Sequence, residues 1–386
     1  MTEENMSKLE ELIEQYCPDG VEWKTLKVVL KIRNGRDYKH LGEGPIPVYG
    51  SGGIMTYVDT PMYTNPSVLI PRKGSIDKLY YVDTPFWNVD TVFYTEIDTA
   101  QVVEKYVYYV LQKEHLEKLN TAGGVPSLTQ SVLNEVIIPV PPLPVQEEIV
   151  RILDTFTELQ AELQAELQKR KQQYNYYLDN LLNFKNINRG GYQAEVRWMK
   201  MKDIGKVCMC KRILKSQTSS YGDVPFFKIG TFGGNADAYI SQALFNEYKA
   251  KYSYPQKGDV LISAAGTIGR TIVFDGTPSY FQDSNIVWLK HDESIVLNSY
   301  LRYCYALNPW VVSTGGTIAR LYNDNILEAT IPVPSLANQQ RIVSILDRFD
   351  RLTNDLTSGL PAEIEKRRQQ YEYYRDKLLT FKRKGA

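Results

Sequence analysis

A long internal repeat constrains the fold of this chain more than any other feature of its sequence. The segment Ile138–Phe156 (IPVPPLPVQEEIVRILDTF) recurs as Ile331–Phe349 (IPVPSLANQQRIVSILDRF), and Arg170–Tyr177 (RKQQYNYY) recurs as Arg367–Tyr374 (RRQQYEYY). The second copy carries about one additional helical turn between its two motifs. A chain of 386 residues with such a duplication is expected to build the same structural unit twice.

Each copy of the repeat carries the apolar pattern of a long amphipathic helix. In the first copy, apolar residues from Ile149 to Leu181 recur at steps of three, four or seven residues, which places them on one helical face. We therefore predict long spacer helices at residues 145–184 and 338–386. Because an interior proline removes a hydrogen bond, we expect a break at Gly359–Pro361, with Pro361 opening a new helical segment.

The two apolar stripes must be buried, and two arrangements would achieve this. The first predicted helix would be roughly 58 Å long, about twice the width of a small domain. This length favours two long antiparallel helices that bury each other's stripes as a coiled coil. In the alternative arrangement, each stripe packs on its own globular domain.

The segments that precede the helices repeat only in outline. Val68–Ile70 matches Val260–Ile262, and both regions are rich in Val, Ile, Tyr and Thr, which favour strands. We expect an α+β protein in which β-rich domains at residues 1–144 and 185–337, the latter with a linker, form a pseudo-two-fold tandem repeat separated by the two helices. Helices that repeat closely and domains that diverge suit a fixed spacer presenting two different readers to an asymmetric, two-part site on a duplex.

The repeated motifs resemble those of one protein family. The doubled Ile-Pro-Val-Pro segments, each followed by Gln-x-x-Ile-Val-x-Ile-Leu-Asp, and the doubled Gln-Gln-Tyr-x-Tyr-Tyr segments resemble the specificity subunit of type I restriction–modification systems. The resemblance covers nearly the whole chain. Within the β-rich domains it rests on Ile46–Gly53, Arg72–Ser75, Val224–Gly230 and Gly266–Arg270.

The resemblance implies a division of labour among several subunits. The two β-rich domains would be target-recognition domains, each reading one half of a split double-stranded DNA sequence, and this chain would have no catalytic site. The helices would contact two methyltransferase (modification) subunits, and two restriction subunits would add translocation and cleavage. The cofactors S-adenosylmethionine, ATP and Mg²⁺ are then expected in the partner subunits, and none in this chain.

Candidate DNA contacts are basic, amide and hydroxyl side chains near glycines and aromatic residues. Arg and Lys bind phosphates, Arg, Asn and Gln read base edges, and glycine-rich turns let backbone amides approach a phosphate. For each residue, the alternative is a solvated surface charge or an ordinary turn. In the first domain, the candidates are Lys31, Arg33, Asn34, Arg36, Lys39, His40, Ser51, Gly52, Arg72 and Lys73. In the second domain, they are Lys211, Arg212, Lys215, Gln217, Lys228, Thr231, Arg270 and Arg320.

The repeated helices supply a second set of candidates, for contacts with partner subunits. The arginines could instead be solvated flanking positions of a coiled coil, and the tyrosines could pack in the seam between the helices. The candidates are Arg170, Tyr174, Tyr177, Arg367, Tyr371 and Tyr374.

Two other classes of function are alternatives to a DNA-recognition subunit. One is a self-contained methyltransferase or nuclease, and the other is a coiled-coil adaptor without a nucleic-acid role. Asn65–Ser67 and Asn308–Trp310 each lack an element of the Asn-Pro-Pro-aromatic motif of adenine methyltransferases. The nuclease-like Asp19 and Glu22 lie only three residues apart, and Arg197 replaces Glu22 in the second domain. The sequence also has no Gly-x-x-x-x-Gly-Lys-Ser/Thr loop for ATP. These observations favour a binding subunit over an enzyme.

Composition adds few further constraints. Four irregularly spaced cysteines and three scattered histidines argue against a disulfide scaffold and against structural zinc. The acidic start and the lack of a long apolar run lead us to expect no secretory signal, no membrane span and a cytoplasmic protein. The net charge of zero neither supports nor excludes DNA binding, because a local basic surface decides it.

Overall fold

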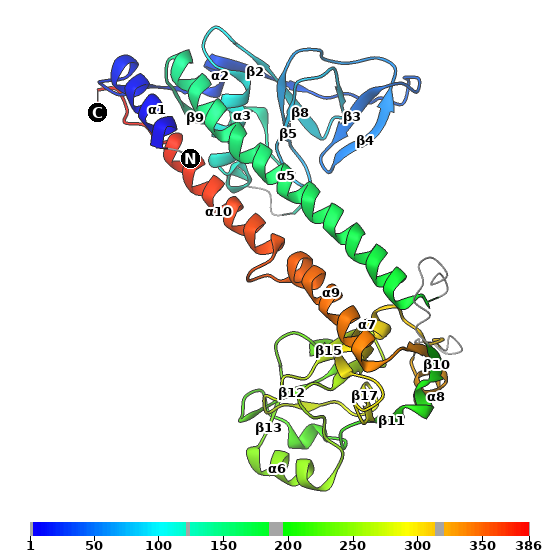
Figure 1. Ribbon diagram of the computed structural model, residues 1–386. Coiled ribbons are helices and arrows are strands. Elements are labelled where there is room, and N and C mark those ends of the chain that lie inside the picture. Colours follow the sequence, from blue (N-terminus) through cyan, green and yellow to red (C-terminus); the bar gives the residue numbers. More distant parts are fainter. Residues whose placement is uncertain (1–2, 121–123, 185–195, 313–319, 386) are drawn as a thin grey trace. The chain divides into compact units, whose positions relative to one another are not determined.

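The computed structural model describes residues 3–120, 124–184, 196–312 and 320–385 (Figure 1). The chain divides into two compact units, of which unit 1 comprises Met1–Ala165 with Ala362–Ala386, and unit 2 comprises Glu166–Pro361. The predicted linker falls largely on residues 185–195, which lie outside the described residues. Unit 1 is thus built from both ends of the chain, and each unit combines one β-rich lobe with parts of the repeated helices.

The first copy of the repeated helix is a single element, whereas the second copy is divided. Helix α5 (Leu143–Leu182) begins before Pro144 rather than after it, because a proline in the first helical turn sacrifices no hydrogen bond. The second copy consists of α9 (Leu336–Asn354) and α10 (Leu360–Leu378). The predicted break is therefore confirmed, with Pro361 in the first turn of α10.

The break between α9 and α10 is stabilised by local contacts. The Asp355 carboxylate accepts hydrogen bonds from the backbone N–H and the hydroxyl of Thr357, at 2.7 and 2.6 Å, and from the Ser358 hydroxyl. These bonds hold the pKa of Asp355 well below its usual range. At Gly359, an added Cβ atom would lie only 2.4 Å from the carbonyl oxygen of Arg351, so the turn requires glycine at this position.

The lobe of unit 1 contains a ribbon of two strands, a four-stranded sheet and a three-stranded sheet. The ribbon pairs β1 (Glu22–Thr25) with β9 (Ile137–Val140), which leads directly into α5. The larger sheet has the order β2-β8-β5-β6 (Leu30–Asn34, Val92–Ile97, Ser67–Pro71, Tyr80–Val82), and the smaller has the order β4-β3-β7 (Gly53–Val58, Ile46–Gly50, Trp87–Asn88). The helices are α1 (Glu3–Tyr16), α2 (Leu26–Val29), α3 (Glu104–Lys113), η1 (Leu116–Leu119) and α4 (Gln130–Asn134).

The lobe of unit 2 contains the same set of sheets. Its ribbon pairs β10 (Arg197–Lys200) with β18 (Thr330–Val333). The larger sheet has the order β11-β17-β14-β15 (Gly205–Cys208, Ile286–His291, Val260–Ser263, Thr271–Val273), and the smaller has the order β13-β12-β16 (Tyr239–Ile240, Val224–Phe227, Tyr280–Phe281). The helices are η3 (Met201–Asp203), η4 (Lys215–Gln217), η5 (Ile229–Thr231), α6 (Gln242–Lys251), α7 (Asn298–Ala306) and α8 (Asn323–Glu328). The repeat seen in the helices therefore extends through the lobes.

The apolar stripes of the helices are buried both against the lobes and against other helices. In unit 1, Ile152 of α5 and Leu378 of α10 belong to one core with the lobe. In unit 2, Leu178 of α5 and Leu346 of α9 do the same. The two arrangements considered from the sequence are thus combined within each unit.

Two aromatic stacks join the repeated helices inside the units. Phe156 of α5 stacks on Tyr374 of α10 in unit 1, with ring centroids 5.4 Å apart. Tyr177 of α5 stacks on Phe349 of α9 in unit 2, with centroids 5.1 Å apart. Each stack pairs the Phe of one repeat with the Tyr of the other. The part of α5 near Phe156 thus contacts α10, and the part near Tyr177 contacts α9, as in an antiparallel pair of helices.

A buried glutamine fixes the start of each repeated helix to the neighbouring backbone. In unit 1, the Gln146 side chain accepts a hydrogen bond from the N–H of Val103 at 2.8 Å. It donates to the carbonyl oxygens of Gln101 and Pro141, at 3.0 and 2.6 Å. Gln339 makes the same three kinds of bond in unit 2, and both glutamines are fully buried. These bonds tie each helix to the end of its own lobe.

The cysteines provide a simple test of this packing. Cys17, Cys208, Cys210 and Cys304 are all free and buried, and burial raises the pKa of Cys210 and of Cys304 to about 12. Because the thiolate is the reactive form, we expect the native protein to react very slowly with a disulfide reagent at pH 8. The reagent should titrate all four thiols after unfolding in guanidinium. A native thiol that reacts within seconds would contradict the packing around it.

Candidate nucleic-acid interface

A pocket of about 540 Å³ in unit 2 gathers four of the predicted DNA contacts. They come from separate parts of the chain: Arg212 and Lys215 follow β11, Lys228 follows β12, and Arg320 precedes α8. The only carboxylate among the lining residues of this pocket is Asp283. The pocket is therefore a local basic surface on a chain without net charge.

Specific contacts orient the basic side chains of this pocket. Arg320 donates to the amide oxygen of Asn285 at 2.7 Å, and Arg212 donates to the Asp283 carboxylate at 2.9 Å. The Lys228 ammonium lies 2.8 Å from a carboxylate oxygen of Asp237. Arg212, Lys228 and Arg320 are thus each held by a polar group that a phosphate or a base edge could replace or share.

The segment Gln282–Asn285 also lines this pocket, although it is not among the contacts predicted from the sequence. The Gln282 N–H donates to the carbonyl of Phe227, and its side-chain oxygen accepts from the N–H of Ile229, both at 2.9 Å. Ser284 has a positive φ of 59°, which turns the segment sharply. A run of polar residues between the buried strands β16 and β17 was the available signal.

The other predicted contacts of unit 2 take different positions. The Lys211 ammonium lies 5.2 Å from the centre of the Tyr252 ring, and the Gln217 amide donates to the Tyr248 hydroxyl. The Thr231 hydroxyl caps η5 by accepting from the N–H of Lys228 at 3.0 Å. Arg270 is exposed and donates to the carbonyl of Gly233 at 3.3 Å. None of Lys211, Gln217, Thr231 and Arg270 lines the basic pocket.

In unit 1, two of the predicted loops meet at the turn between β3 and β4. The Tyr80 hydroxyl donates to the carbonyl of Ser51 at 3.1 Å, and a Cβ on Gly74 would lie 3.4 Å from the Ser51 hydroxyl. Arg72, just before Gly74, donates to the Asn34 side chain at 3.5 Å and lies over the Phe93 ring. The structure thus brings the Ser51–Gly52 turn close to the Arg72–Lys73 loop, and Gly52 and Lys73 are exposed there.

The predicted cluster between Lys31 and His40 is divided between a strand and a loop. Lys31 and Arg33 lie on exposed positions of β2, where a hydrogen bond with Glu96 raises the pKa of Arg33. In the following loop, the Trp87 indole donates to the carbonyl of Arg36 at 2.9 Å, and the His40 ring meets the Trp87 ring edge-on. The side chains of Arg36, Lys39 and His40 are exposed in this loop.

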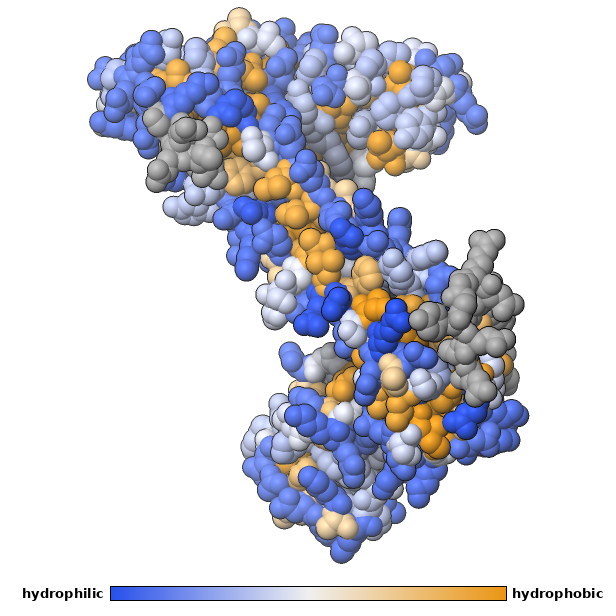
Figure 2. Space-filling view, viewed as in Figure 1, coloured by the Kyte–Doolittle hydropathy of each residue, from blue (hydrophilic) through white to orange (hydrophobic). Residues whose placement is uncertain are grey.

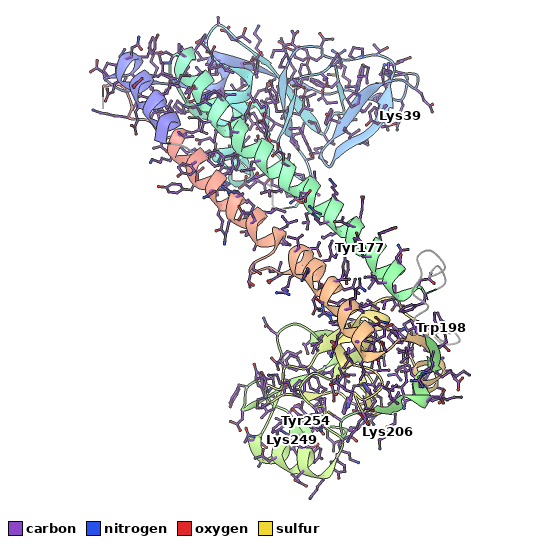
Figure 3. All side chains as sticks on the ribbon, in the orientation of Figure 1. Lys39, Tyr177, Trp198, Lys206, Lys249 and Tyr254 are labelled. Atoms are coloured by element: carbon purple, nitrogen blue, oxygen red, sulfur yellow. The ribbon has the colours of Figure 1, made fainter. Side chains whose placement is uncertain are left out.

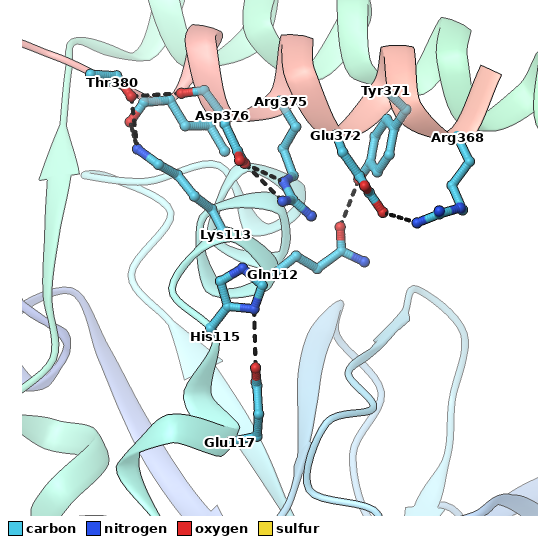
Figure 4. Close-up of polar contacts among 11 residues, drawn as sticks. Gln112, Lys113, His115, Glu117, Arg368, Tyr371, Glu372, Arg375, Asp376 and Thr380 are labelled. Carbon is cyan, nitrogen blue, oxygen red and sulfur yellow. Dashed lines mark hydrogen bonds and ion pairs between the residues drawn. The ribbon is translucent and has the colours of Figure 1, made fainter. Parts of the chain in front are cut away.

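The tyrosines predicted for partner contacts lie inside the units, in line with the seam packing that the sequence left open. Tyr371 is buried, and its hydroxyl donates to Gln112 at 2.7 Å (Figure 4). Tyr174 packs against the core of unit 2, and Tyr177 and Tyr374 form the stacks described above. Arg170 and Arg367 form ion pairs with Glu166 and Glu363 on their own helices. The adjacent Tyr176 and Tyr373 are each 63% exposed.

Two classes of feature are missing from the described part of the chain. No group of three or more His, Cys, Asp or Glu residues there could hold a metal ion. No helix in the same residues is both long and apolar enough to cross a membrane.

Comparisons with known proteins agree on one family. A family model described as the type I restriction modification DNA specificity domain matches residues 18–170 and 193–366, once in each repeat. A putative type I restriction enzyme specificity subunit from Haemophilus influenzae is 45% identical over 393 residues, covering 98% of this chain and 99% of its own length. The EcoR124I/EcoR124II specificity subunit of Escherichia coli is 30% identical over 411 residues, covering 97% of each chain.

A solved structure supports the fold as well. The S subunit of the type I restriction–modification system from M. genitalium aligns with a TM-score of 0.60 over 93% of this chain and 96% of its own, at 14% identity. The expected fold class, two recognition domains in tandem with long helices, is therefore confirmed. This chain belongs to the family of type I restriction–modification specificity subunits, whose members provide DNA recognition rather than catalysis.

Proposed function

We propose that the chain reads an asymmetric DNA sequence in two separate halves, one with each lobe. The observation that carries this proposal is the basic pocket of unit 2, where Arg212, Lys215, Lys228 and Arg320 converge from distant segments. Phosphates would bind the lysines, while Arg320 and the neighbouring amides would read base edges. The lobe of unit 1 offers different groups around Ser51 and Arg72, which suits a different half-site. The predicted contacts in both lobes stand as proposals on this basis.

The boundaries and partners predicted from the sequence form the rest of the proposal. Recognition domains at residues 1–144 and 185–337 and spacer helices at 145–184 and 338–386 would assemble with two methyltransferase and two restriction subunits in the cytoplasm. Those subunits would bring S-adenosylmethionine, ATP and Mg²⁺. Because most of the predicted tyrosines are occupied inside the units, Arg170, Arg367 and the exposed Tyr176 and Tyr373 are the contacts best placed for partners.

Sequencing of methylated bases tests the proposal directly. The chain should be expressed together with the methyltransferase subunits of its own system in cells that lack other DNA methylation. We expect one motif with two specified parts and an unspecified gap, and no methylation when this chain is omitted. A single continuous motif, or methylation without the chain, would contradict the two-part reading.

The variant Arg320→Ala tests the basic pocket. Loss of a base-reading arginine costs about 1–3 kcal/mol, so we expect binding of the specific duplex to weaken roughly fivefold to 150-fold. The preference for bases should relax at positions within one half-site only. Lys206→Ala is the matched control, because Lys206 is an exposed cation on β11 outside the pocket (Figure 3). Equal effects of the two variants, measured by competition binding, would refute a reading role for Arg320.

A further inference from the structure

Strand β4 of unit 1 exposes a row of large apolar side chains at the edge of a sheet. Ile54, Met55 and Tyr57 are 50%, 58% and 51% exposed, although β4 is hydrogen-bonded to β3 on one side only. Figure 2 shows apolar atoms at the surface where Figure 1 places this hairpin. An exposed apolar edge strand favours unwanted pairing with strands of other chains. We therefore expect this strand to serve as a binding surface.

A β-bulge limits what can bind along this edge. Tyr49 pairs with Ile54 and Val48 pairs with Thr56, so Met55 is the extra residue without a partner in the ladder. A bulge bends the strand and interrupts its row of hydrogen-bonding groups, which opposes the addition of a strand from another protein. The Met55 side chain folds over Gly50, where an added Cβ would clash with its sulfur atom. The edge therefore presents apolar side chains rather than free backbone.

Loops that carry exposed basic side chains flank both ends of β4. At its start, the Ser51 turn contacts Gly74 and thereby the Arg72–Lys73 loop. At its end, the N–H of Asp59 donates to the carbonyl of Gly42 at 3.0 Å, which places the loop with Lys39 beside the hairpin (Figure 3). Basic residues outnumber acidic ones in the segment Arg72–Lys78, while the loop beside the end of β4 carries Arg36 and Lys39 together with Asp37 and Glu43. An apolar row between two loops that carry exposed Arg and Lys side chains fits a DNA groove, which has apolar groups of the bases between two phosphate backbones.

From this arrangement we infer that the β3–β4 hairpin of unit 1 enters a groove of the duplex. There Ile54 and Met55 make apolar contacts with base edges, including thymine methyl groups, while the flanking loops bind phosphates. The inference rests on the proposed function and adds to it the residues that determine specificity. In unit 2 the corresponding edge strand is β13, whose Ile240 is buried, so only the half-site read by unit 1 would depend on such contacts.

The double variant Ile54→Ser/Met55→Ser tests the inference in the full complex with its methyltransferase subunits. We expect the affinity for the specific duplex to fall about tenfold. The dependence of binding on salt should keep its slope, because no phosphate contact is removed. Methylation of a library with randomised half-sites should show weaker base preference in the half read by unit 1, identified by exchanging that lobe, and unchanged preference in the other half.

A matched control and two contrary outcomes make this test decisive. Val28→Ser/Val125→Ser removes two exposed apolar residues of unit 1 outside the hairpin and should behave as wild type. Unchanged affinity and base preference in the Ile54/Met55 variant would overturn the inference. So would a loss of assembly with the methyltransferase subunits in mass photometry, since the edge would then bind protein. If the wild-type complex itself lacked base preference, the proposed function would fail instead.

Discussion

Replacing residues 201–329 with the matching segment of a relative of different specificity is expected to change one half of the recognised DNA sequence completely. The structure makes this segment a suitable module, because its ends meet: the N–H of Met201 donates to the carbonyl of Ala329 at 2.9 Å. The β10·β18 ribbon lies outside the cut points and would keep its pairing. Methylation at the original site should fall to background, and sequencing of methylated bases should show a new second half beside the original first half.

The control for this exchange is a chimera that receives a segment from a relative with the same second half-site. It should methylate the original sequence and so show that the junctions are tolerated. A change in both half-sites, or in neither, would mean that recognition is not divided between the lobes.

Removing the buried glutamine of unit 2 is expected to cause a large loss of stability. Gln339→Leu keeps the approximate size of the side chain but removes a buried amide that bonds three backbone groups, the N–H of Leu297 and the carbonyls of Ile295 and Pro334, each at 2.9 Å. An unpaired buried polar group costs about 1–3 kcal/mol, so we expect a loss of about 3–5 kcal/mol. Denaturant unfolding followed by tryptophan fluorescence measures the change, because Trp288 and Trp310 are buried in this unit.

Two further variants define the origin of that loss. Gln146→Leu removes the equivalent bonds in unit 1 and should destabilise that unit to a similar extent. Gln369→Leu, on the exposed side of α10, should change the midpoint little, because its amide bonds only to the Glu365 side chain. If Gln339→Leu unfolded at the wild-type midpoint, the bonds would contribute nothing measurable to stability.

The framework of the fold could be predicted from the sequence because it depends on local patterns. The spacing of apolar residues predicted the helices, and the position of Pro361 predicted the division of the second one. The same pattern could not tell whether Tyr371 faces a partner or the interior, since one apolar stripe serves both purposes. The structure shows that the Tyr371 side chain is buried and that its hydroxyl donates to Gln112.

The candidate site was less accessible to sequence reasoning because its parts are joined by tertiary contacts. Arg212 and Arg320 could be named from their chemistry, but their convergence in one pocket depends on the turn at Ser284. The bulge at Met55 arises from a shift in strand register that no local pattern revealed. Such features depend on how distant segments pair, and residue type alone does not determine this.

The reciprocal stacks have a consequence for how the two halves of the gene can evolve. Phe156 from the first repeat fits Tyr374 from the second, while Phe349 from the second fits Tyr177 from the first. A substitution in either duplicate therefore alters a contact whose other member is encoded in the opposite half, so the helical copies drift only as a matched pair. The residues that line the basic pocket of unit 2 all come from its own lobe, so a new specificity can arise there without a matching change in the other repeat.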